Sequence, residues 1–267
     1  MDHKPIKTNQ LFWGNALRKS TLIIFIFLLG IYFSALLSSP ALYAGGKDLN
    51  AEGHSKIMPI SWDQAFPRII SLPDNDRLAQ GEILCEIKNA DPRTLVVQSV
   101  GLIKAKAEEC FKVVRNYNQY VRLMPYTVEN KVVRSFHLEG DYYGSEAVDF
   151  WTRVRVLGFD TRYLLRIAHL LDPKHNRFRS FWTLVDNPEE VSGCLDFENK
   201  PCQNDLALNL GSHQFEPFPG NSNYTLHTYT VMLSGKSWLQ QTAFRLGGKK
   251  NLAEVTLAIR NALERKK

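Results

Sequence analysis

The seven histidines are the side chains best suited to acid–base chemistry at neutral pH. His169 has the clearest setting, because it falls on the apolar face of the strand-like run 159–171. A titratable ring on an apolar face can act as acid or base, or can orient a ligand carbonyl. A hydrogen-bonded histidine within the fold is favoured over this catalytic role. The sequence does not indicate which face of the sheet His213 and His227 point to, and the support for an acid–base role is weaker for these two residues.

The sequence lacks the motifs of the common catalytic and metal sites. It has no Gly-x-Ser-x-Gly elbow, no His-Glu-x-x-His and no glycine-rich phosphate loop. It has no Cys-x-x-Cys pair, which argues against a zinc ribbon or a thioredoxin-type site. We therefore expect neither a metal nor a cofactor. Binding is favoured over catalysis, and catalysis stays open.

The four cysteines fall into two groups. Cys194 and Cys202 lie in one polar loop, where a disulfide would pin a long excursion of the chain. Bridged and unbridged states of this pair both remain open. Cys85 lies in a strand-like run and Cys110 in a helix-like run, and two separate small thiols are favoured there over a second bridge.

The first 44 residues have the three-part layout of an export signal. Four Lys or Arg residues precede the apolar run from Thr21 to Leu37, and small residues follow it. This pattern predicts either a cleaved signal peptide or an uncleaved membrane anchor. In both cases we expect an exported domain, periplasmic or secreted, in a compartment where disulfides persist.

Domain boundaries follow from composition. Residues 45–80 are rich in Gly, Pro, Asp and Asn, and they predict a linker with one short helix near Trp62 to Ile70. The folded domain is expected at residues 81–267.

The formal net charge of +6 comes from the two ends of the chain. Residues 1–44 carry +3 and residues 236–267 carry +6, which leaves −3 for the body. A nucleic-acid binder would need a basic stripe on the body itself, so we do not expect nucleic acid as a partner. Anionic lipid head groups suit a basic end helix better, and an anionic membrane surface is the expected partner.

Alternating strand-like runs dominate the second half of the chain. Two runs form a hairpin within residues 81–103, a helical stretch starts near Lys106, and Pro125 ends it. Long strands with short turns between them predict antiparallel neighbours. The further strands are expected at 127–137, 145–156, 159–171, 177–186, 207–215 and 224–234.

The alternation assigns two faces to this sheet. Asp149 and Arg153 share one face with Arg166 of the next strand, and this charged face is expected to meet solvent. Trp151 falls on the same face. Arg134 is expected to reach solvent at a strand end, which is favoured over an inward position with an anionic ligand partner.

The opposite, apolar face needs a cover, and the last helix offers one. Its apolar stripe consists of Leu252, Val255, Ile259, Ala262 and Leu263. Gly247 and Gly248 predict a kink upstream of that stripe.

Residues 100–125 resemble the first strand, paired helices and second-strand entry of START-like domains, the polyketide-cyclase-like (SRPBCC, helix-grip) superfamily. The likeness lies in Ile103 to Ala107 with Phe111, in Asn116 to Tyr120, and in Met124-Pro125. The segment 237–242 resembles the start of the gripped helix. The resemblance implies an α+β helix-grip fold, in which a curved antiparallel sheet wraps a long C-terminal helix and two short helices follow the first family strand.

The same resemblance implies a cavity for a lipid, sterol, quinone or polyketide. We therefore expect an exported START-like domain that binds or carries a hydrophobic small molecule. Candidate ligand-binding residues are Phe150, Tyr163, Ile167, His169, Trp182, Tyr229 and Trp238. One alternative is a cyclase or dehydratase that uses His169 or a tyrosine on a polyketide-like substrate. Another is a non-binding envelope protein whose aromatic side chains fill the cavity.

Overall fold

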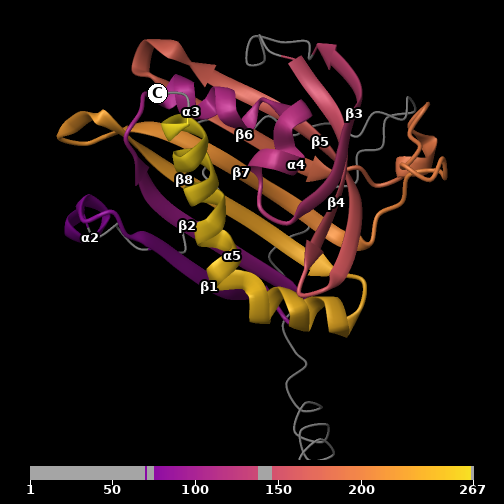
Figure 1. Cartoon of the computed structure of the whole chain (residues 1–267). Helices are drawn as coiled ribbons and strands as arrows, with labels where there is room; N and C mark the ends of the chain where they lie inside the picture. Colours follow the sequence, from indigo (N-terminus) through magenta and orange to yellow (C-terminus); the bar gives the residue numbers. More distant parts are fainter. Residues whose placement is uncertain (1–69, 71–74, 138–145, 266–267) are drawn as a thin grey trace, which may run out of the picture. The chain divides into compact units, whose positions relative to one another are not determined.

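The computed structural model describes residues 70, 75–137 and 146–265 (Figure 1). They belong to one compact unit, residues 53–267. The expected export signal, the helix expected near Trp62 and most of the expected linker lie outside the described residues. Within the described ranges, no helix combines the length and apolar character needed to cross a bilayer.

Eight strands form one antiparallel sheet in the order β1-β2-β8-β7-β6-β5-β4-β3. Each strand-like run expected from the alternation is a strand in the structure. The bounds are β1 Ile83–Asp91, β2 Thr94–Ile103, β3 Thr127–His137, β4 Glu146–Val156, β5 Phe159–Asp172, β6 Arg177–Leu184, β7 Leu206–Phe218 and β8 Asn221–Gly235.

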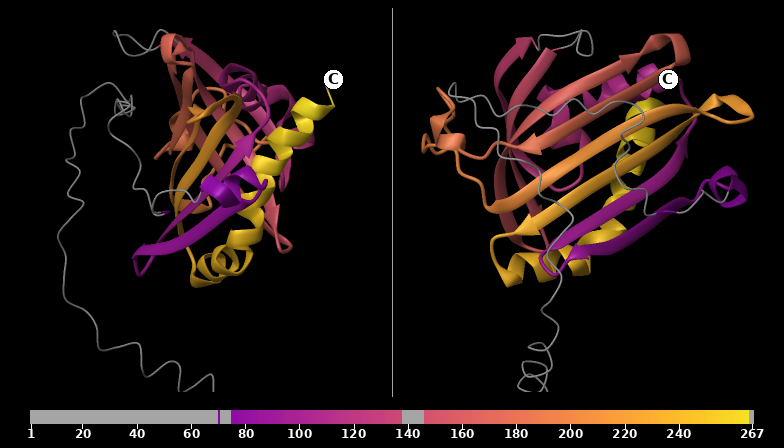
Figure 2. Two further views of the ribbon diagram at one scale, coloured as in Figure 1. Left: turned by 90° about the vertical axis from the view of Figure 1, so that its left-hand side faces the viewer. Right: turned by 180° about the vertical axis from the view of Figure 1, so that it is seen from behind.

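Helices cover the concave face of this sheet. Figures 1 and 2 show the sheet curving around α5, with α3 and α4 at one end of the same face. This arrangement confirms the predicted α+β helix-grip fold, with its two short helices after β2. The bounds are α2 Asn75–Ala79, α3 Ala107–Val114, η1 Tyr117–Gln119, α4 Tyr120–Leu123, η2 Pro173–His175, η3 Pro188–Glu190 and α5 Trp238–Glu264.

The packing of α5 follows its apolar stripe. Leu252, Ile259 and Ala262 are buried, and Val255 and Leu263 are half-buried. Thr256 lies among them and is fully buried. Figure 1 shows that α5 bends, so that a shorter first arm and a longer second arm run in different directions.

Packing of the domain begins before residue 81. Leu78 of α2 is fully buried against Leu84, Val100 and Leu102. The backbone N–H of Ile70 donates to Gln98 Oε1 at 3.0 Å. Residues from the segment expected to be a linker therefore contribute to the folded unit.

The charged face of the sheet is not simply solvent-exposed, and that prediction was wrong at its centre. Asp149 is 0% exposed and Arg166 is 4% exposed. The two Asp149 oxygens accept from Nε and Nη2 of Arg166 at 2.8 and 3.0 Å, and Arg134 Nε donates to the same carboxylate at 2.5 Å. Alternation indicates which side chains share a face, but it does not indicate whether that face is covered. The anionic partner of Arg134 is thus Asp149.

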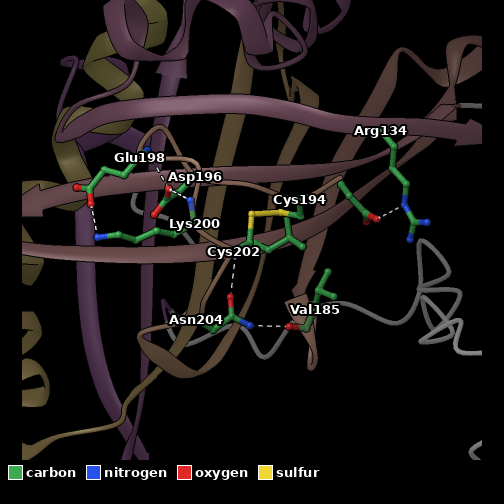
Figure 3. The surroundings of a disulfide bond; sticks show 10 residues. Arg134, Val185, Cys194, Asp196, Glu198, Lys200, Cys202 and Asn204 are labelled. Carbon is green, nitrogen blue, oxygen red and sulfur yellow. Dashed lines mark hydrogen bonds and ion pairs between the residues drawn. A yellow bond between two sulfur atoms is a disulfide. The ribbon is translucent and has the colours of Figure 1, made fainter. Parts of the chain in front are cut away.

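A long loop covers another part of this outer face. Trp151 is 1% exposed and packs with Val185, Val191, Cys194 and Cys202. Asn204 holds the loop to the sheet, since Leu164 N–H donates to its Oδ1 at 2.8 Å and its Nδ2 donates to the Val185 carbonyl at 2.5 Å (Figure 3). Trp151 is therefore a core residue beneath the loop.

Cys194 and Cys202 form a disulfide in this loop, with their Cα atoms 5.4 Å apart (Figure 3). Cys85, which is half-buried, and Cys110, which is buried, do not form a disulfide.

Removing the disulfide by Cys194→Ser with Cys202→Ser is expected to lower the free energy of unfolding by about 2.5 kcal/mol. The estimate follows from the entropy of closing a short loop, here a sequence separation of 8, in the unfolded chain. Urea unfolding with and without dithiothreitol measures the difference. The control variant Cys85→Ser should remain as sensitive to reductant as the wild type. If dithiothreitol leaves the unfolding midpoint unchanged in the wild type and in Cys85→Ser, the prediction is contradicted.

Candidate functional site

A cavity of about 220 Å³ lies between the concave face of the sheet and α5. Its wall comes from β2, β4, β5, β6, β7, β8 and α5, and from the corner between α4 and β3. Aliphatic and aromatic side chains dominate this wall. Among the described residues that line it, none is Asp, Glu, Lys or Arg.

The volume limits what the cavity holds in this conformation. Pockets for drug-sized ligands usually measure about 300–1,000 Å³, whereas an apolar cavity of about 150 Å³ is enough to bind benzene. A cavity of about 220 Å³ therefore suits one or two rings or a short chain. A larger ligand requires the wall to move.

Five of the seven candidate ligand-binding residues line this cavity. They are Phe150, Tyr163, Ile167, Trp182 and Tyr229. Four different strands supply them, because the period of two directs alternate side chains of each strand to the concave face. Their role in binding stays a prediction.

His169 faces the concave side as expected, but it does not line the cavity, so its prediction as a ligand-binding residue was wrong. It lies further along β5, where its Nε2 is 3.0 Å from the hydroxyl oxygen of Tyr117. The Phe111 ring of α3 packs edge-on against it, with ring centroids 5.1 Å apart. The helices after β2 therefore cover this part of the sheet and separate His169 from the cavity.

Trp238 does not line the cavity either. It is 74% exposed in the first turn of α5, and Phe244 of the same helix lines the wall instead. Ser237 fixes the helix start, because its hydroxyl accepts from Gln240 N–H at 3.3 Å. The family likeness located this helix but not its rotation about its own axis.

A glycine shapes the cavity wall at a position that sequence analysis missed. A Cβ atom on Gly211 would lie 2.3 Å from Trp182 Cζ2 and 2.7 Å from the Thr230 carbonyl oxygen. The absence of a side chain therefore lets the Trp182 indole approach the β7 backbone closely, where its Nε1 donates to Asn209 Oδ1 at 2.9 Å. A glycine inside a strand pattern is the sequence signal for such a close approach.

Two buried histidines, His213 and His227, connect the cavity wall to α5. The sequence alone did not indicate which face of the sheet they point to. His213 lines the cavity, and its Nδ1 is 3.1 Å from Nε2 of His227. Nδ1 of His227 is in turn 3.0 Å from the hydroxyl oxygen of Thr256. A continuous polar contact thus runs from the cavity to the gripped helix.

Burial keeps the titratable groups of this region uncharged near neutral pH. It lowers the pKa of His213 to about 3, and it holds the pKa of His227 well below its ordinary value, with His213 and Arg260 adding to the effect. Burial also raises the pKa of the tyrosines Tyr163 and Tyr229. The cavity therefore has a neutral wall over the physiological pH range.

The buried histidines should make stability depend on pH. Burial, assisted by Arg115, lowers the pKa of His169 to about 3, as burial does for His213, whereas an unfolded chain has a histidine pKa of about 6.5. Between these values the unfolded state binds more protons, so the free energy of unfolding falls as pH falls from 6.5 towards 3. With His227 included, the slope should approach about 4 kcal/mol per pH unit near pH 5.

Urea unfolding at several pH values between 7 and 5 measures this slope. His213→Phe removes one titrating group and should reduce the slope by about a third. A free energy of unfolding that stays constant across this range would contradict the prediction.

Tyr126 ties the corner between α4 and β3 to the helix. Its hydroxyl donates to Glu254 Oε2 of α5 at 2.5 Å, and its ring lines the cavity. Burial and the nearby carboxylate raise the pKa of Tyr126 to about 12, so the hydroxyl keeps its proton. Tyr126 also has a positive φ of 65°, an uncommon conformation for a bulky residue. We call the Tyr126–Glu254 hydrogen bond the corner latch.

Comparisons with known proteins identify the fold. No protein-family model matches the sequence, and no curated protein matches it. Human StAR-related lipid transfer protein 5 is similar in structure, with a TM-score of 0.50 at 11% identity over 68% of this chain and 86% of that chain. The chain therefore has the START-like, helix-grip fold.

Two further solved structures are similar at lower scores. The lipid transfer and protein localization domain of human StarD13 gives a TM-score of 0.49 at 13% identity, over 67% of this chain and 83% of that chain. The Zhui aromatase/cyclase from Streptomyces sp. R1128 gives 0.46 at 13% identity, over 65% and 96%. Identities this low describe a fold, and a fold does not determine an activity.

Proposed function

We propose that this START-like domain binds an uncharged, hydrophobic small molecule in the cavity between the sheet and α5. The observation that carries the proposal is the cavity wall, which is aromatic and aliphatic and has no charged side chain among its described residues. Burying a ligand charge without a partner is costly, so such a wall selects against ions. The lipid transfer function named for human StAR-related lipid transfer protein 5 fits this class of ligand. Lipids, sterols and quinones are the candidates.

Isothermal titration calorimetry with 1-decanol and with decanoate at pH 8 tests this proposal. The two probes share a chain length and differ in charge. We expect 1-decanol to bind more tightly by about tenfold or more, because the carboxylate would be buried without a cation. Equal affinities, or tighter binding of decanoate, would overturn the assignment to uncharged ligands.

The α5 helix serves as the gate in this proposal, because a ligand larger than about 220 Å³ needs the wall to open. The corner latch joins α5 to the opposite rim of the cavity, and the bend in α5 (Figure 1) gives the helix a place to pivot. Opening would expose the cavity to a membrane or to another carrier.

Breaking the corner latch by Tyr126→Phe is expected to speed exchange of bound 1-decanol about tenfold or more, with little change in the fold. The hydrogen bond to a carboxylate is worth about 1.5 kcal/mol or more, which the open state lacks. Stopped-flow displacement measures the exchange rate. Tyr224→Phe, which removes a hydroxyl away from the cavity, is the matched control. Exchange at the wild-type rate in Tyr126→Phe would rule out the latch as a gate.

The two alternatives have less support. A cyclase or dehydratase that uses His169 would need this ring at the ligand, yet helices separate His169 from the cavity. One that uses a tyrosine would have Tyr163 or Tyr229 at the cavity, but burial raises the pKa of both hydroxyls, which disfavours them as bases. A cavity filled by its own aromatic side chains is hard to reconcile with about 220 Å³ of free space.

We also propose that the domain acts outside the cytoplasm, in the periplasm or as a secreted protein. The Cys194–Cys202 disulfide supports this location, because reducing compartments rarely keep such bonds. Mass spectrometry of the chain from its own cells, after thiol alkylation without reduction, tests it. We expect an N-terminus created by cleavage at the end of the segment 1–44 or an intact anchor, with both cysteines unalkylated. Alkylated Cys194 and Cys202 in a cytoplasmic fraction would overturn it.

An anionic membrane surface is the proposed site of action. The first arm of α5 exposes Trp238 and Leu246 at 74% and 77%, and such residues favour a membrane interface. Arg260 contributes less than its charge suggests, since it donates to the carbonyls of Leu102 and Gly81 at 2.8 and 3.1 Å.

Flotation with vesicles of phosphatidylcholine, with and without phosphatidylglycerol, tests membrane association. We expect binding to the anionic vesicles, and weaker binding after Trp238→Ala. Absence of binding to both kinds of vesicle would count against a membrane site.

A further inference from the structure

The buried contact between His213, His227 and Thr256 is built by strand register. His213 of β7 pairs with Tyr229 of β8, and Phe215 pairs with His227, so the two histidines are diagonal neighbours on the concave face. Thr256 of α5 reaches His227 because the helix comes close at Gly101, where a Cβ atom would lie 3.1 Å from Thr256 Cγ2. All three side chains are at most 5% exposed. We call this set the His–His–Thr relay.

The relay has one end in the cavity. His213 uses Nδ1 for its contact with His227, and Nε2 makes no hydrogen bond to any residue in the described part of the chain. Two other polar groups of the wall are engaged, since Thr152 donates to the Glu129 carbonyl and Asn209 accepts from Trp182. The hydroxyls of Tyr163 and Tyr229 also lie at the wall, and no residue in the described part of the chain accepts from them. Nε2 of His213 is the polar atom of the wall that belongs to a hydrogen-bonded chain leading to α5.

Neutral histidines can point their hydrogen bonds in two directions along this relay. If the Thr256 hydroxyl donates to Nδ1 of His227, then Nε2 of His227 carries the proton and donates to Nδ1 of His213. Nε2 of His213 then carries a proton and presents a donor to the cavity. If all the hydrogen bonds reverse, Nε2 of His213 becomes an acceptor and His227 donates to Thr256.

We propose that His213 determines ligand specificity by binding one hydroxyl or carbonyl oxygen of an otherwise apolar ligand, and that the relay couples its tautomer to Thr256 of α5. The inference deepens the proposed function and rests on it. A carbonyl oxygen selects the donor state of His213, and a hydroxyl group is compatible with either state. An apolar ligand without oxygen leaves a buried nitrogen without a hydrogen bond, which lowers its affinity.

Three neutral naphthalene probes of similar size test this specificity: 2-acetylnaphthalene, 2-naphthol and 2-ethylnaphthalene. The affinity of each probe is first corrected for its partitioning from water into an apolar solvent. After this correction, we expect the two oxygen-containing probes to bind the full chain about tenfold more tightly than 2-ethylnaphthalene. His213→Phe keeps an aromatic ring and should remove that advantage while changing the affinity for 2-ethylnaphthalene less than twofold. His175→Phe makes the same substitution on an exposed histidine and is the control.

The relay itself is tested by the tautomers. Long-range ¹H–¹⁵N correlation spectra of ¹⁵N-histidine-labelled protein show which ring nitrogens of His213 and His227 carry protons. Saturation with 2-acetylnaphthalene should place the proton of His213 on Nε2 and that of His227 on Nε2. Thr256→Val removes the terminal hydroxyl, and it should change the tautomer populations of both histidines. It should also weaken binding of the oxygen-containing probes, with no further effect in the His213→Phe background.

The outcomes separate the two proposals. If no probe binds, the proposed function fails. If all three bind and His213→Phe leaves their relative affinities unchanged, the function stands and the inference is overturned. A larger loss in Tyr163→Phe than in His213→Phe would assign the ligand oxygen to that tyrosine and also overturn it. The tautomers of His213 and His227 could stay the same with and without a probe, while His213→Phe still weakens binding of the oxygen-containing probes. That result would overturn the coupling to α5.

Discussion

Replacing Gly211 by alanine is expected to destabilise the domain by about 2 kcal/mol and to weaken binding of 1-decanol more than tenfold. The new Cβ would lie 2.3 Å from Trp182 Cζ2, a distance that real side chains do not adopt. The Thr230 carbonyl oxygen at 2.7 Å blocks a shift of the methyl group the other way. The indole must therefore move towards the cavity and lose its hydrogen bond to Asn209, and overpacking of this kind costs about 1–3 kcal/mol.

A double substitution separates this mechanism from a general weakness of β7. Trp182→Leu removes the indole atoms that clash, so Gly211→Ala should cost much less in that background. Urea unfolding and calorimetry of the wild type, both single variants and the double variant give the coupling energy. Equal costs of Gly211→Ala in both backgrounds would show that the indole is not the cause.

Asp149→Ala is expected to lower the free energy of unfolding by about 3–5 kcal/mol. Its carboxylate is fully buried on the outer face of the sheet and accepts from Arg166, which is also buried, and from Arg134. Removing one partner from a buried ion pair leaves the other charge with its desolvation cost and without its compensation. Folding should therefore depend on this residue although the cavity lies on the opposite face.

Asp160→Ala provides the control, because it removes a carboxylate from a partly exposed pair with Arg155. Exposed pairs contribute little, so this variant should unfold close to the wild-type midpoint. Urea unfolding at pH 7 compares the two variants. A loss of less than about 1 kcal/mol in Asp149→Ala would contradict a structural role for the buried pair.

Period-two alternation explains why much of the cavity wall was predictable. Phe150, Tyr163 and Trp182 alternate with charged or outward-facing neighbours in their strands, which predicts the concave face, and they line the cavity. The pattern does not indicate position along a strand. His169 lies two residues beyond Ile167, about 7 Å further along β5, and that distance is enough to leave the cavity.

The relay and the outer face needed information that the sequence pattern does not contain. Phe218 pairs with Asn221 at the turn, and counting back from this pair would place Leu226 opposite His213. A register shift between Pro217 and Phe218 instead brings Tyr229 there, which puts His227 on the same face as His213. Similarly, the alternation places Asp149 and Arg166 on the same charged face of the sheet, but their burial depends on what covers that face.

Native mass spectrometry of the full chain, purified without added lipid and followed by organic extraction, shows whether the domain holds a hydrophobic ligand. We expect a bound, uncharged molecule that extraction removes, in wild-type protein and in the His175→Phe control but not in Gly211→Ala. A chain that carries no ligand, and that binds neither 1-decanol nor a naphthalene probe when these are added, would contradict this expectation.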